Sequence, residues 1–404
     1  MKILHTSDWH LGKKLYSRDR LPEQILVLDE IHSIAEEENV DCIVVAGDLF
    51  DVINPSNDAN ELFYKSIKKL SKNGKCPIIA IAGNHDSPDR IESLDPLARE
   101  CGIILLGFPK SKCSPFKLEN GLEVLQSDEG FLELKLPNCT TPLRIIATPY
   151  INEIRLLQSL GDDEDKGLRE FLQNFWKTLA QKYCDDKGVN LLVAHLFVWG
   201  KEGELPEEPD GEKPIRIGNA SIVYVDLIPE EIQYTALGHL HRSQFIDSGD
   251  TVAAYCGSPL AYSFKEAGQK KYVHIIEANT GEKVTVSKRE LIKGYQLKKA
   301  EFTSVLEAIQ WLEQNTEAFT EITMKTDTFL SPEEYKALRE PSKNLLNIIP
   351  EPKNVSDEES FKIADLEKSI EELFTDYFML KKGQKPNVEI MGLLKEILNR
   401  RELQ

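Results

Sequence analysis

The sequence predicts an α/β protein built around a mostly parallel sheet. Residues 26–38 and 59–70 have apolar residues at helical spacing, and they lie between short apolar segments rich in β-branched residues. Strands and helices that alternate in this way form βαβ units, in which neighbouring strands run parallel. Five apolar segments are typical of buried strands, and each runs into side chains that bind metals. These segments are 2–10, 42–48, 78–86, 191–195 and 235–241.

The polar residues at the ends of these segments are candidates for a single site. In an open α/β sheet, the site lies in the crevice outside the carboxyl ends of the strands. Residues far apart in the sequence can therefore meet at that edge. The expected members are Asp8, His10, Asp48, Asn84, His85, Asp86, His195, His239 and His241. His5, His32 and His274 lack a second ligand beside a glycine-flanked strand end, so we interpret them as structural.

The length and composition predict a globular protein of two or three domains. A chain of 404 residues is too long for one small core. The seven cysteines form no CxxC pair, which favours reduced thiols over a disulfide framework or a zinc ribbon. We find no signal-peptide pattern and no apolar run of roughly 18 residues, so we expect a cytoplasmic protein without a membrane span.

The net charge restricts how the chain could bind a nucleic acid. Lys and Arg number 49 and Asp and Glu number 67, which gives 49 − 67 = −18. Proteins that bind DNA alone normally present a basic face, because phosphate neutralisation supplies most of the affinity. If the substrate is a nucleic acid, bound metal ions and a more basic partner must supply much of the attraction.

We expect four segments along the chain. The acidic stretches 161–167 and 201–214 are predicted to be exposed loops within the first segment. The two helical stretches of the C-terminal tail cannot bury their apolar face alone, so the tail either folds back or docks onto a partner. The sequence leaves both alternatives open. The segments are a catalytic domain (1–280), a small α+β capping domain (285–345), a linker around one short strand (346–360) and the helical tail (361–404).

The candidate ligands favour a pair of metal ions. Carboxylate and amide oxygens mixed with imidazole nitrogens suit Mn, Fe or Zn, and no thiolate of a structural zinc site is present among them. Manganese is the best single choice, with Mg²⁺, Fe or Zn as alternatives. The seven candidate ligands, which exclude His85 and Asp86, are too many for one ion. They are Asp8, His10, Asp48, Asn84, His195, His239 and His241. Two ions about 3.5–4 Å apart that share Asp48 would use all seven and would activate a water for attack on phosphorus.

His85 and Asp86 are predicted to act beside the metals. His85 follows the ligand Asn84 directly, so we expect its ring to face the substrate and to protonate the leaving oxygen. Asp86 is expected to hydrogen-bond that ring, fix its tautomer and raise its pKa.

Several motifs of the chain resemble those of a known family. They are HTSDWHLG (5–12), VAGDLFD (45–51), AGNHDS (82–87), ALGHLHR (236–242), YCGSP (255–259) and KKYVH (270–274). In this order they resemble the calcineurin-like metallophosphoesterases, and among these the double-strand-break repair nucleases of bacteria. The resemblance covers about residues 1–280 strongly and the remainder only in layout.

The resemblance carries expectations for the fold, the site and the partners. It implies a four-layer α/β/β/α sandwich, a DNA-binding cap, and a C-terminal helical element that binds the coiled-coil base of the ATPase SbcC. The activity implied is ATP-stimulated 3′-to-5′ double-strand exonuclease and hairpin or end-processing endonuclease in DNA repair, recombination and replication, with a homodimer as the assembly. One Mn²⁺ would be held by Asp8, His10, Asp48 and His241, and the other by Asp48, Asn84, His195 and His239.

Two positions depart from the wider family pattern. Asp51 stands where many relatives carry His, and Ala194 stands where Gly is common. An alternative function is a metallophosphoesterase for small substrates, which would share every ligand. Another is a DNA-tethering scaffold with little catalysis, but such a scaffold is expected to lose ligands and none is missing here.

Overall fold

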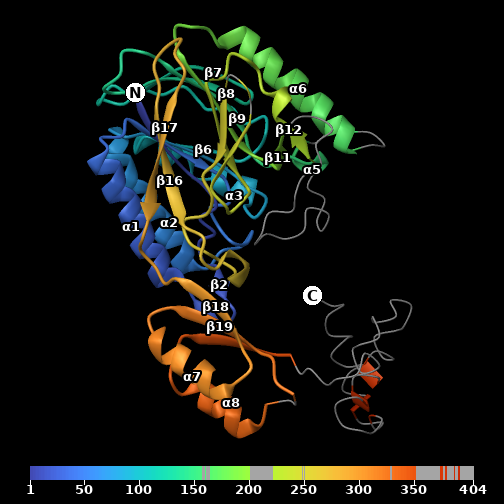
Figure 1. Ribbon diagram of the computed structural model, residues 1–404. Helices are drawn as coiled ribbons and strands as arrows, with labels where there is room; N and C mark the ends of the chain where they lie inside the picture. The colour runs from blue at the N-terminus through green and yellow to red at the C-terminus, as the bar shows by residue number, and fades with distance from the viewer. Residues whose placement is uncertain are drawn as a thin grey trace.

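The computed structural model describes residues 1–156, 160, 164–200, 222–247, 249, 251–327 and 330–351, with a few positions between 374 and 391. A large body carries the two main sheets, and a small α/β unit lies at one end of it (Figure 1). We call this small unit, residues 297–350, the cap. None of the helices in the described part of the chain is long and apolar enough to cross a membrane.

The first sheet of the body has six strands in the order β17-β16-β1-β4-β5-β6. Strands β1, β4, β5 and β6 run parallel, whereas β16 and β17 pair antiparallel at one side. All residues of β4 and β5 are buried, which explains their continuous apolar sequences. The strands are β1 (Lys2–Thr6), β4 (Cys42–Ala46), β5 (Ile78–Ile81), β6 (Ile103–Leu106), β16 (Lys271–Glu277) and β17 (Thr285–Leu291).

The second sheet has seven strands in the order β14-β15-β13-β10-β9-β8-β7. Its four central strands are parallel, and antiparallel strands complete both sides. Two short pairs, β2 with β3 and β11 with β12, lie outside the main sheets. The strands are β7 (Glu123–Asp128), β8 (Phe131–Lys135), β9 (Leu143–Thr148), β10 (Val189–His195), β13 (Tyr234–Gly238), β14 (Gln244–Ile246) and β15 (Val252–Tyr255), with β2 (Lys14–Leu15), β3 (Arg18–Asp19), β11 (Val198–Trp199) and β12 (Val223–Tyr224).

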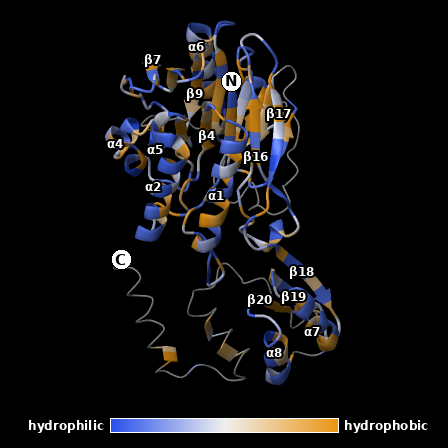
Figure 2. Cartoon of the chain, turned by 90° about the vertical axis from the view of Figure 1, so that its left-hand side faces the viewer, coloured by the Kyte–Doolittle hydropathy of each residue, from blue (hydrophilic) through white to orange (hydrophobic). Residues whose placement is uncertain are grey.

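The two sheets pack face to face and helices cover both outer faces, so the predicted four-layer α/β/β/α sandwich is confirmed. Apolar side chains of β4 and β10, such as Val44 and Val193, fill the space between the sheets. Phe63 of α2 packs on the first sheet, and Trp176 of α6 packs on the second. Figure 2 shows the apolar strands inside the body. The helices are α1 (Leu21–Glu37), α2 (Asn57–Ser71), α3 (Pro88–Glu92), α4 (Asp95–Glu100), α5 (Glu153–Leu156) and α6 (Glu164–Tyr183).

The predicted helices exist, but their first turns lie earlier than expected. The helix predicted over 26–38 begins at Leu21, with a proline in its first turn as helices allow. The helix predicted over 59–70 begins at Asn57, and the Ser56 side chain caps it by accepting from the Ala59 N–H. The first turn of α1 (LPEQ) has Leu21 and a proline before two polar residues, and that of α2 (NDAN) is mostly polar, so apolar spacing alone could not locate them.

The prediction of a loop over 161–167 is wrong for residues 164–167, because α6 begins at Glu164. Acidic residues are favourable in the first turn of a helix, so an acidic stretch can begin a helix as well as form a loop. The predicted loop 201–214 and nearly all of the predicted tail 361–404 lie outside the described residues.

The cap is a three-stranded parallel sheet with two helices. The strands pair in the order β18-β19-β20, and α7 packs on the sheet next to α8. Its borders differ from the predicted 285–345, because β17 at 285–291 belongs to the first sheet of the body and β20 extends to 350. The elements are β18 (Leu297–Phe302), α7 (Val305–Gln314), β19 (Phe319–Met324), α8 (Pro332–Arg339) and β20 (Leu345–Pro350).

A polar contact crosses the apolar layer between the two sheets. His5 of β1 and His274 of β16 are paired residues of the first sheet, and both are fully buried. The hydroxyl of Tyr234, which comes from the second sheet, lies 2.9 Å from His5 Nδ1 and 3.3 Å from His274 Nδ1. These histidines therefore have the structural role expected for them.

We predict that His274 makes the protein sensitive to acid. Burial, and then Lys288, lower the pKa of His274 to about 3 from an ordinary value of 6.5. The unfolded chain therefore binds a proton below about pH 6.5 that the folded chain does not, and the free energy of unfolding falls by about 1.4 kcal/mol per pH unit as the pH decreases. Urea unfolding between about pH 7 and pH 5 should show a shallower pH dependence for His274→Gln than for the wild type. An unchanged slope would contradict the prediction, and His32→Gln on α1 is the control.

Candidate metal centre

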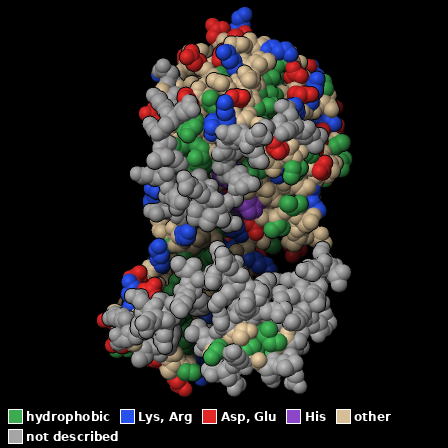
Figure 3. All heavy atoms as spheres, turned by 90° about the vertical axis from the view of Figure 1, so that its right-hand side faces the viewer, with side chains coloured by type: hydrophobic (Ala, Val, Ile, Leu, Met, Phe, Trp, Pro, Cys, Tyr) green, Lys and Arg blue, Asp and Glu red, His purple; other side chains and the backbone are tan. Residues whose placement is uncertain are grey.

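Five strand ends bring the predicted ligands to one edge of the sandwich. Asp8 and His10 follow β1, Asp48 follows β4, and Asn84 follows β5. His195 is the last residue of β10, and β13 ends just before His239 and His241. The first sheet thus contributes four of these residues and the second sheet contributes three. Histidine atoms reach the surface on the face of the body that lies above the cap (Figure 3).

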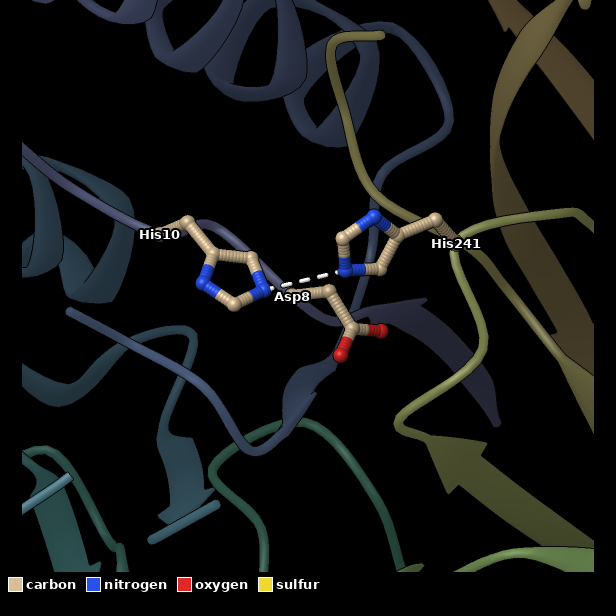
Figure 4. A group of neighbouring side chains, drawn as sticks. All are labelled: Asp8, His10 and His241. Carbon is tan, nitrogen blue, oxygen red and sulfur yellow. Dashed lines mark hydrogen bonds between the residues drawn. The ribbon is translucent and has the colours of Figure 1, made fainter. Parts of the chain in front are cut away.

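Asp8, His10 and His241 form the first group of metal-type side chains, with their ligand atoms within 4.8 Å of one another. The Nε2 atoms of His10 and His241 lie 3.0 Å apart, and the carboxylate of Asp8 is beside them (Figure 4). Asp8 is fully buried and also accepts from the backbone N–H of His239 at 2.9 Å. Two segments of the chain, those after β1 and β13, therefore meet at this position.

Asp48 lies between this first group and a second group, which consists of Asn84, His195 and His239. Its Oδ2 atom is 3.5 Å from His10 Nε2 and 3.4 Å from His195 Nε2. The amide oxygen of Asn84 is 3.0 Å from the same His195 nitrogen and 3.2 Å from His239 Nδ1. One carboxylate oxygen thus faces imidazoles from both sheets, which is the arrangement needed to share a ligand between two ions.

A hydrogen bond to the backbone of β4 orients the His195 ring. Its Nδ1 donates to the carbonyl oxygen of Ala46 at 2.8 Å, so Nε2 is the nitrogen that faces Asp48 and Asn84. In metal sites, a hydrogen bond of this kind from one ring nitrogen fixes the tautomer and the orientation of the ring, so that the other nitrogen can bind the metal. Ala194 has no positive φ, so the backbone at this position does not require the glycine that is common in the wider family.

Charges within the site shift the pKa values in opposite directions. Burial raises the pKa of the Asp48 carboxyl, but His195 and His10 lower it well below its usual range. Burial lowers the pKa of His195, yet Asp48 and Asp8 raise it to about 9. Burial lowers the pKa of His239 to about 3, so that ring is neutral and has a free lone pair. The two carboxylates therefore favour the charged form of the His195 ring, whereas burial favours the neutral form of His239.

Backbone strain accumulates at the candidate ligands. Asp8, His10, Asp48 and His239 have φ angles of 53°, 45°, 50° and 108°. Residues with a side chain rarely adopt these values, and each one costs of order 1–3 kcal/mol. Such strain persists where the surrounding structure holds the backbone firmly, and it concentrates at functional sites.

Close approach of the backbone requires glycine next to two ligands. A Cβ atom on Gly83 would lie 2.1 Å from the Asp48 Oδ1 atom. Gly47 has a φ of +90°, and its Cβ would lie 2.2 Å from His195 Nδ1. The glycines of the GD and GNH motifs therefore leave the space in which the ligands meet.

The predicted contact between Asp86 and His85 is wrong. The Asp86 carboxylate accepts from the backbone N–H groups of Leu49, Phe50 and Gly83 at 2.8–3.0 Å. It therefore ties the loop after β4 to the loop after β5. His85 Nδ1 lies 2.7 Å from the carbonyl oxygen of Asp51, and its backbone N–H donates to Asp48 Oδ1. The buried backbone donors occupy the Asp86 oxygens, so a main-chain carbonyl orients the ring instead.

Three further polar residues, which were not predicted as members of the site, lie around it. Asp51 lies 3.5 Å from His10 Nδ1 and forms a cluster of metal-type side chains with His10 and His85. Glu266 lies 3.5 Å from His241 Nδ1. Arg155 donates to the carbonyl oxygens of Gly83 and Asp86 at 2.8 Å. Asp51 stands in the same motif as Asp48 and was detectable, whereas Glu266 and Arg155 lie in segments without any distinctive pattern.

The donor set and its geometry fit a pair of metal ions. Carboxylate oxygens, an amide oxygen and imidazole nitrogens converge from two sheets. Residues 1–242 match the model of the calcineurin-like phosphoesterases. The chain belongs to this family of metal-dependent hydrolases.

Comparison with individual proteins shows which members of this family the chain is similar to. The chain is 36% identical over 408 residues to SbcD, a component of the nuclease SbcCD of Bacillus subtilis (strain 168), with 98% of this chain and 97% of that protein covered. It is therefore a homologue of SbcD over its whole length. Among solved structures, a dimetal phosphatase from Danio rerio has a TM-score of 0.39 at 12% identity and covers 72% of this chain and 97% of its own. The Thermus thermophilus protein TT1561 has a TM-score of 0.35 at 10% identity, with 71% and 98% covered.

Proposed function

We propose that this chain is the manganese-dependent nuclease subunit of an SbcCD-type complex. The observation that carries the proposal is the convergence of seven ligands from both sheets around Asp48. The identity to a nuclease component over 98% of the chain supports DNA as the substrate. The proposed activities are 3′-to-5′ exonuclease on duplex ends and endonuclease on hairpins, both stimulated by ATP through the partner.

The ligands divide into two overlapping sets in this proposal. Asp8, His10, Asp48 and His241 would hold one Mn²⁺, and Asp48, Asn84, His195 and His239 would hold the other. When bound, the two ions would lower the pKa of the attacking water and stabilise charge on the phosphoryl oxygens. Asp48 Oδ2 lies within 3.5 Å of imidazoles from both sets, which supports its proposed role as the shared ligand.

His85 is proposed to act on the leaving group. Its ring nitrogen Nδ1 is held by the Asp51 carbonyl oxygen, which can only accept a hydrogen bond. Nδ1 therefore carries a proton, and Nε2 faces the leaving oxygen. To act as the acid, the ring would carry a second proton on Nε2, give it to the leaving oxygen and become neutral. Asp86 has no direct part in this step, since its oxygens accept from backbone donors.

Replacing His85 with leucine is expected to separate catalysis from metal binding. Loss of a general acid lowers the rate by about 10²–10⁴-fold. The two metal positions should remain filled, because the ring of His85 belongs to neither proposed ligand set. Turnover of DNA and the metal content by mass spectrometry are measured together, with His32→Leu as the control. Retained cleavage would contradict the role of His85.

The substrate class is tested with purified chain, Mn²⁺ and two substrates. One is end-labelled linear duplex DNA and the other is bis(p-nitrophenyl) phosphate, each with and without the partner ATPase and ATP. Shortening of the duplex that requires Mn²⁺ and rises with the partner and ATP is the expected result. Turnover of the small ester alone would make a small-substrate phosphoesterase the better assignment. Duplex binding without any hydrolysis would favour a tethering scaffold.

The tail is proposed to bind the partner ATPase, SbcC, and the cap is proposed to bind duplex DNA. Deletion of residues from about 360 onward should release the partner and leave the Mn²⁺-dependent exonuclease activity of the free chain largely unchanged. The physical reason is that all proposed ligands lie before residue 242, within the body. Co-purification with the partner measures the first effect, and an intact complex would place the contact elsewhere. A homodimer within the complex belongs to the same proposal.

A further inference from the structure

The N-cap and first turn of α1, which we call the start of α1, contain three polar side chains that are almost completely buried. Arg20, Glu23 and Gln24 are 0%, 3% and 1% exposed. Arg20 makes a two-pronged ion pair with Glu23, in which Nη2 donates to Oε1 at 3.0 Å, and its Nη1 donates to the carbonyl oxygen of Ala261 at 3.0 Å. Buried charges of this kind are costly unless they are paired, and such a cluster requires an explanation.

One side of the start of α1 contacts the cap and the segment that leads to it. Glu23 accepts from the backbone N–H of Tyr295 at 2.7 Å, two residues before β18. The Arg20 guanidinium carbon lies 5.4 Å from the ring centroid of Phe319 on β19. Phe319 also belongs to the apolar cluster between cap and body, whose buried members are Leu15, Phe264, Leu297 and Phe319. The cap is therefore in direct contact with Arg20, and the segment before it is held by Glu23.

The other side of the start of α1 contacts the wall of the metal centre. The Arg20 guanidinium carbon lies 5.9 Å from the ring centroid of Tyr262. Gln24 donates to the carbonyl oxygen of His10 at 2.8 Å and to the Tyr262 hydroxyl at 3.1 Å. The Tyr262 hydroxyl in turn donates to the carbonyl oxygen of Trp9. The backbone that carries His10 is thus held by side chains from α1 and by Tyr262.

Tyr262 also packs against two of the proposed ligands. Its ring centroid lies 5.6 Å from that of His10 and 6.1 Å from that of His241, with both pairs edge to face. Its backbone N–H donates to Glu266 at 3.1 Å, the carboxylate beside His241. Tyr262 is therefore the residue through which Arg20 can affect both rings.

We propose that Arg20 and Tyr262 are positioning residues. They couple the contact between the cap and the body to the affinity of the metal position that contains His10 and His241. A seated cap places Phe319 against Arg20, and Arg20 holds Tyr262 against the two histidines. A cap that moves away removes the aromatic face from Arg20 and loosens this metal position, while the Asn84–His195–His239 position is unaffected. The inference rests on the proposed two-metal function and adds a regulation of one half of the centre.

Two pairs of matched variants test the coupling. Tyr262→Phe removes the hydroxyl but keeps the ring, and Tyr234→Phe is the same change in a buried tyrosine between the two sheets. Phe319→Leu removes the aromatic face that contacts Arg20, and Phe302→Leu is the same change elsewhere in the cap, where the ring packs on Trp311. Mn²⁺ binding is titrated by electron paramagnetic resonance, and hydrolysis of bis(p-nitrophenyl) phosphate is followed as a function of Mn²⁺ concentration. This small ester does not require DNA contacts of the cap.

Tyr262→Phe is expected to weaken one of two Mn²⁺ binding events by about tenfold, as is usual for partners of metal ligands. Phe319→Leu should weaken the same event by about three- to tenfold. Excess Mn²⁺ should restore hydrolysis in both variants, and both controls should match the wild type. Wild-type binding in Tyr262→Phe and Phe319→Leu, or activity loss that excess Mn²⁺ does not restore, would overturn the coupling alone. A wild-type protein that binds no Mn²⁺ would overturn the proposed function and the coupling with it.

Discussion

Replacing Asp48 with asparagine is expected to remove both metal ions and to lower phosphodiester hydrolysis by at least about a thousandfold. Asp48 Oδ2 lies between His10 Nε2 and His195 Nε2, so a single change affects both proposed ligand sets. The amide has the same shape as the carboxylate but lacks its charge. Metal content by mass spectrometry and turnover of duplex DNA are the measurements.

The control for this substitution is Asp41→Asn, which lies at the opposite end of β4 and accepts from the Lys2 backbone N–H. It should keep both metal ions and ordinary turnover. Asp48→Asn should also remain folded, because the amide fits the same space and its oxygen can still accept from the backbone N–H of His85. An Asp48→Asn protein that retains two metal ions would show that Asp48 is not the shared ligand.

Replacing Gly238 with alanine is expected to disrupt both the fold and the site. A Cβ atom there would lie 1.8 Å from the carbonyl oxygen of Ala46, which is the acceptor for His195 Nδ1. The backbones of β13 and β4 come from different sheets, so the methyl group would force the two sheets apart at the metal centre. We expect the free energy of unfolding to fall by about 3–5 kcal/mol. Urea unfolding and metal content measure the two effects.

Gly268→Ala is the matched control, because a Cβ atom there would have no heavy atom within 4 Å. Its φ of +81° still makes alanine unfavourable, by roughly 1–2 kcal/mol, but the metal content should stay unchanged. Equal stability and metal loss in the two variants would mean that the close approach at Gly238 is not what the site requires.

Local patterns in the sequence predicted the mostly parallel sheet and the meeting of the candidate ligands, whereas the four layers of the body were predicted from the resemblance to a known family. β4 and β5 are continuous apolar runs, which a fully buried parallel strand explains. Because parallel strands end at a common edge, Asp48 and Asn84 were expected to be neighbours, and their side chains lie around the same His195 nitrogen.

The contacts that the sequence could not predict are those made by polar side chains with the backbone. Asp86 was expected to hold His85, but three main-chain N–H groups occupy its oxygens instead. The loops that present these donors are defined only after the two strands have packed. The burial of Arg20, Glu23 and Gln24 was not predicted for a related reason. Charged and amide residues at the start of a helix are usually exposed, and here segments far along the chain, such as those of Tyr262 and Tyr295, cover them.

The division of the metal centre between the two sheets has a consequence for the time at which the protein becomes active. Protein synthesis proceeds from the N-terminus, and a growing chain that has not reached His195 holds only Asp8, His10, Asp48 and Asn84 of the seven ligands. Such a chain lacks β10 and β13 and therefore the whole imidazole contribution of the second sheet. We therefore expect hydrolysis only after the strands of both sheets have been made and joined. A product that ends before His195 lacks three of the seven proposed ligands and is expected to leave the phosphodiesters around it uncut.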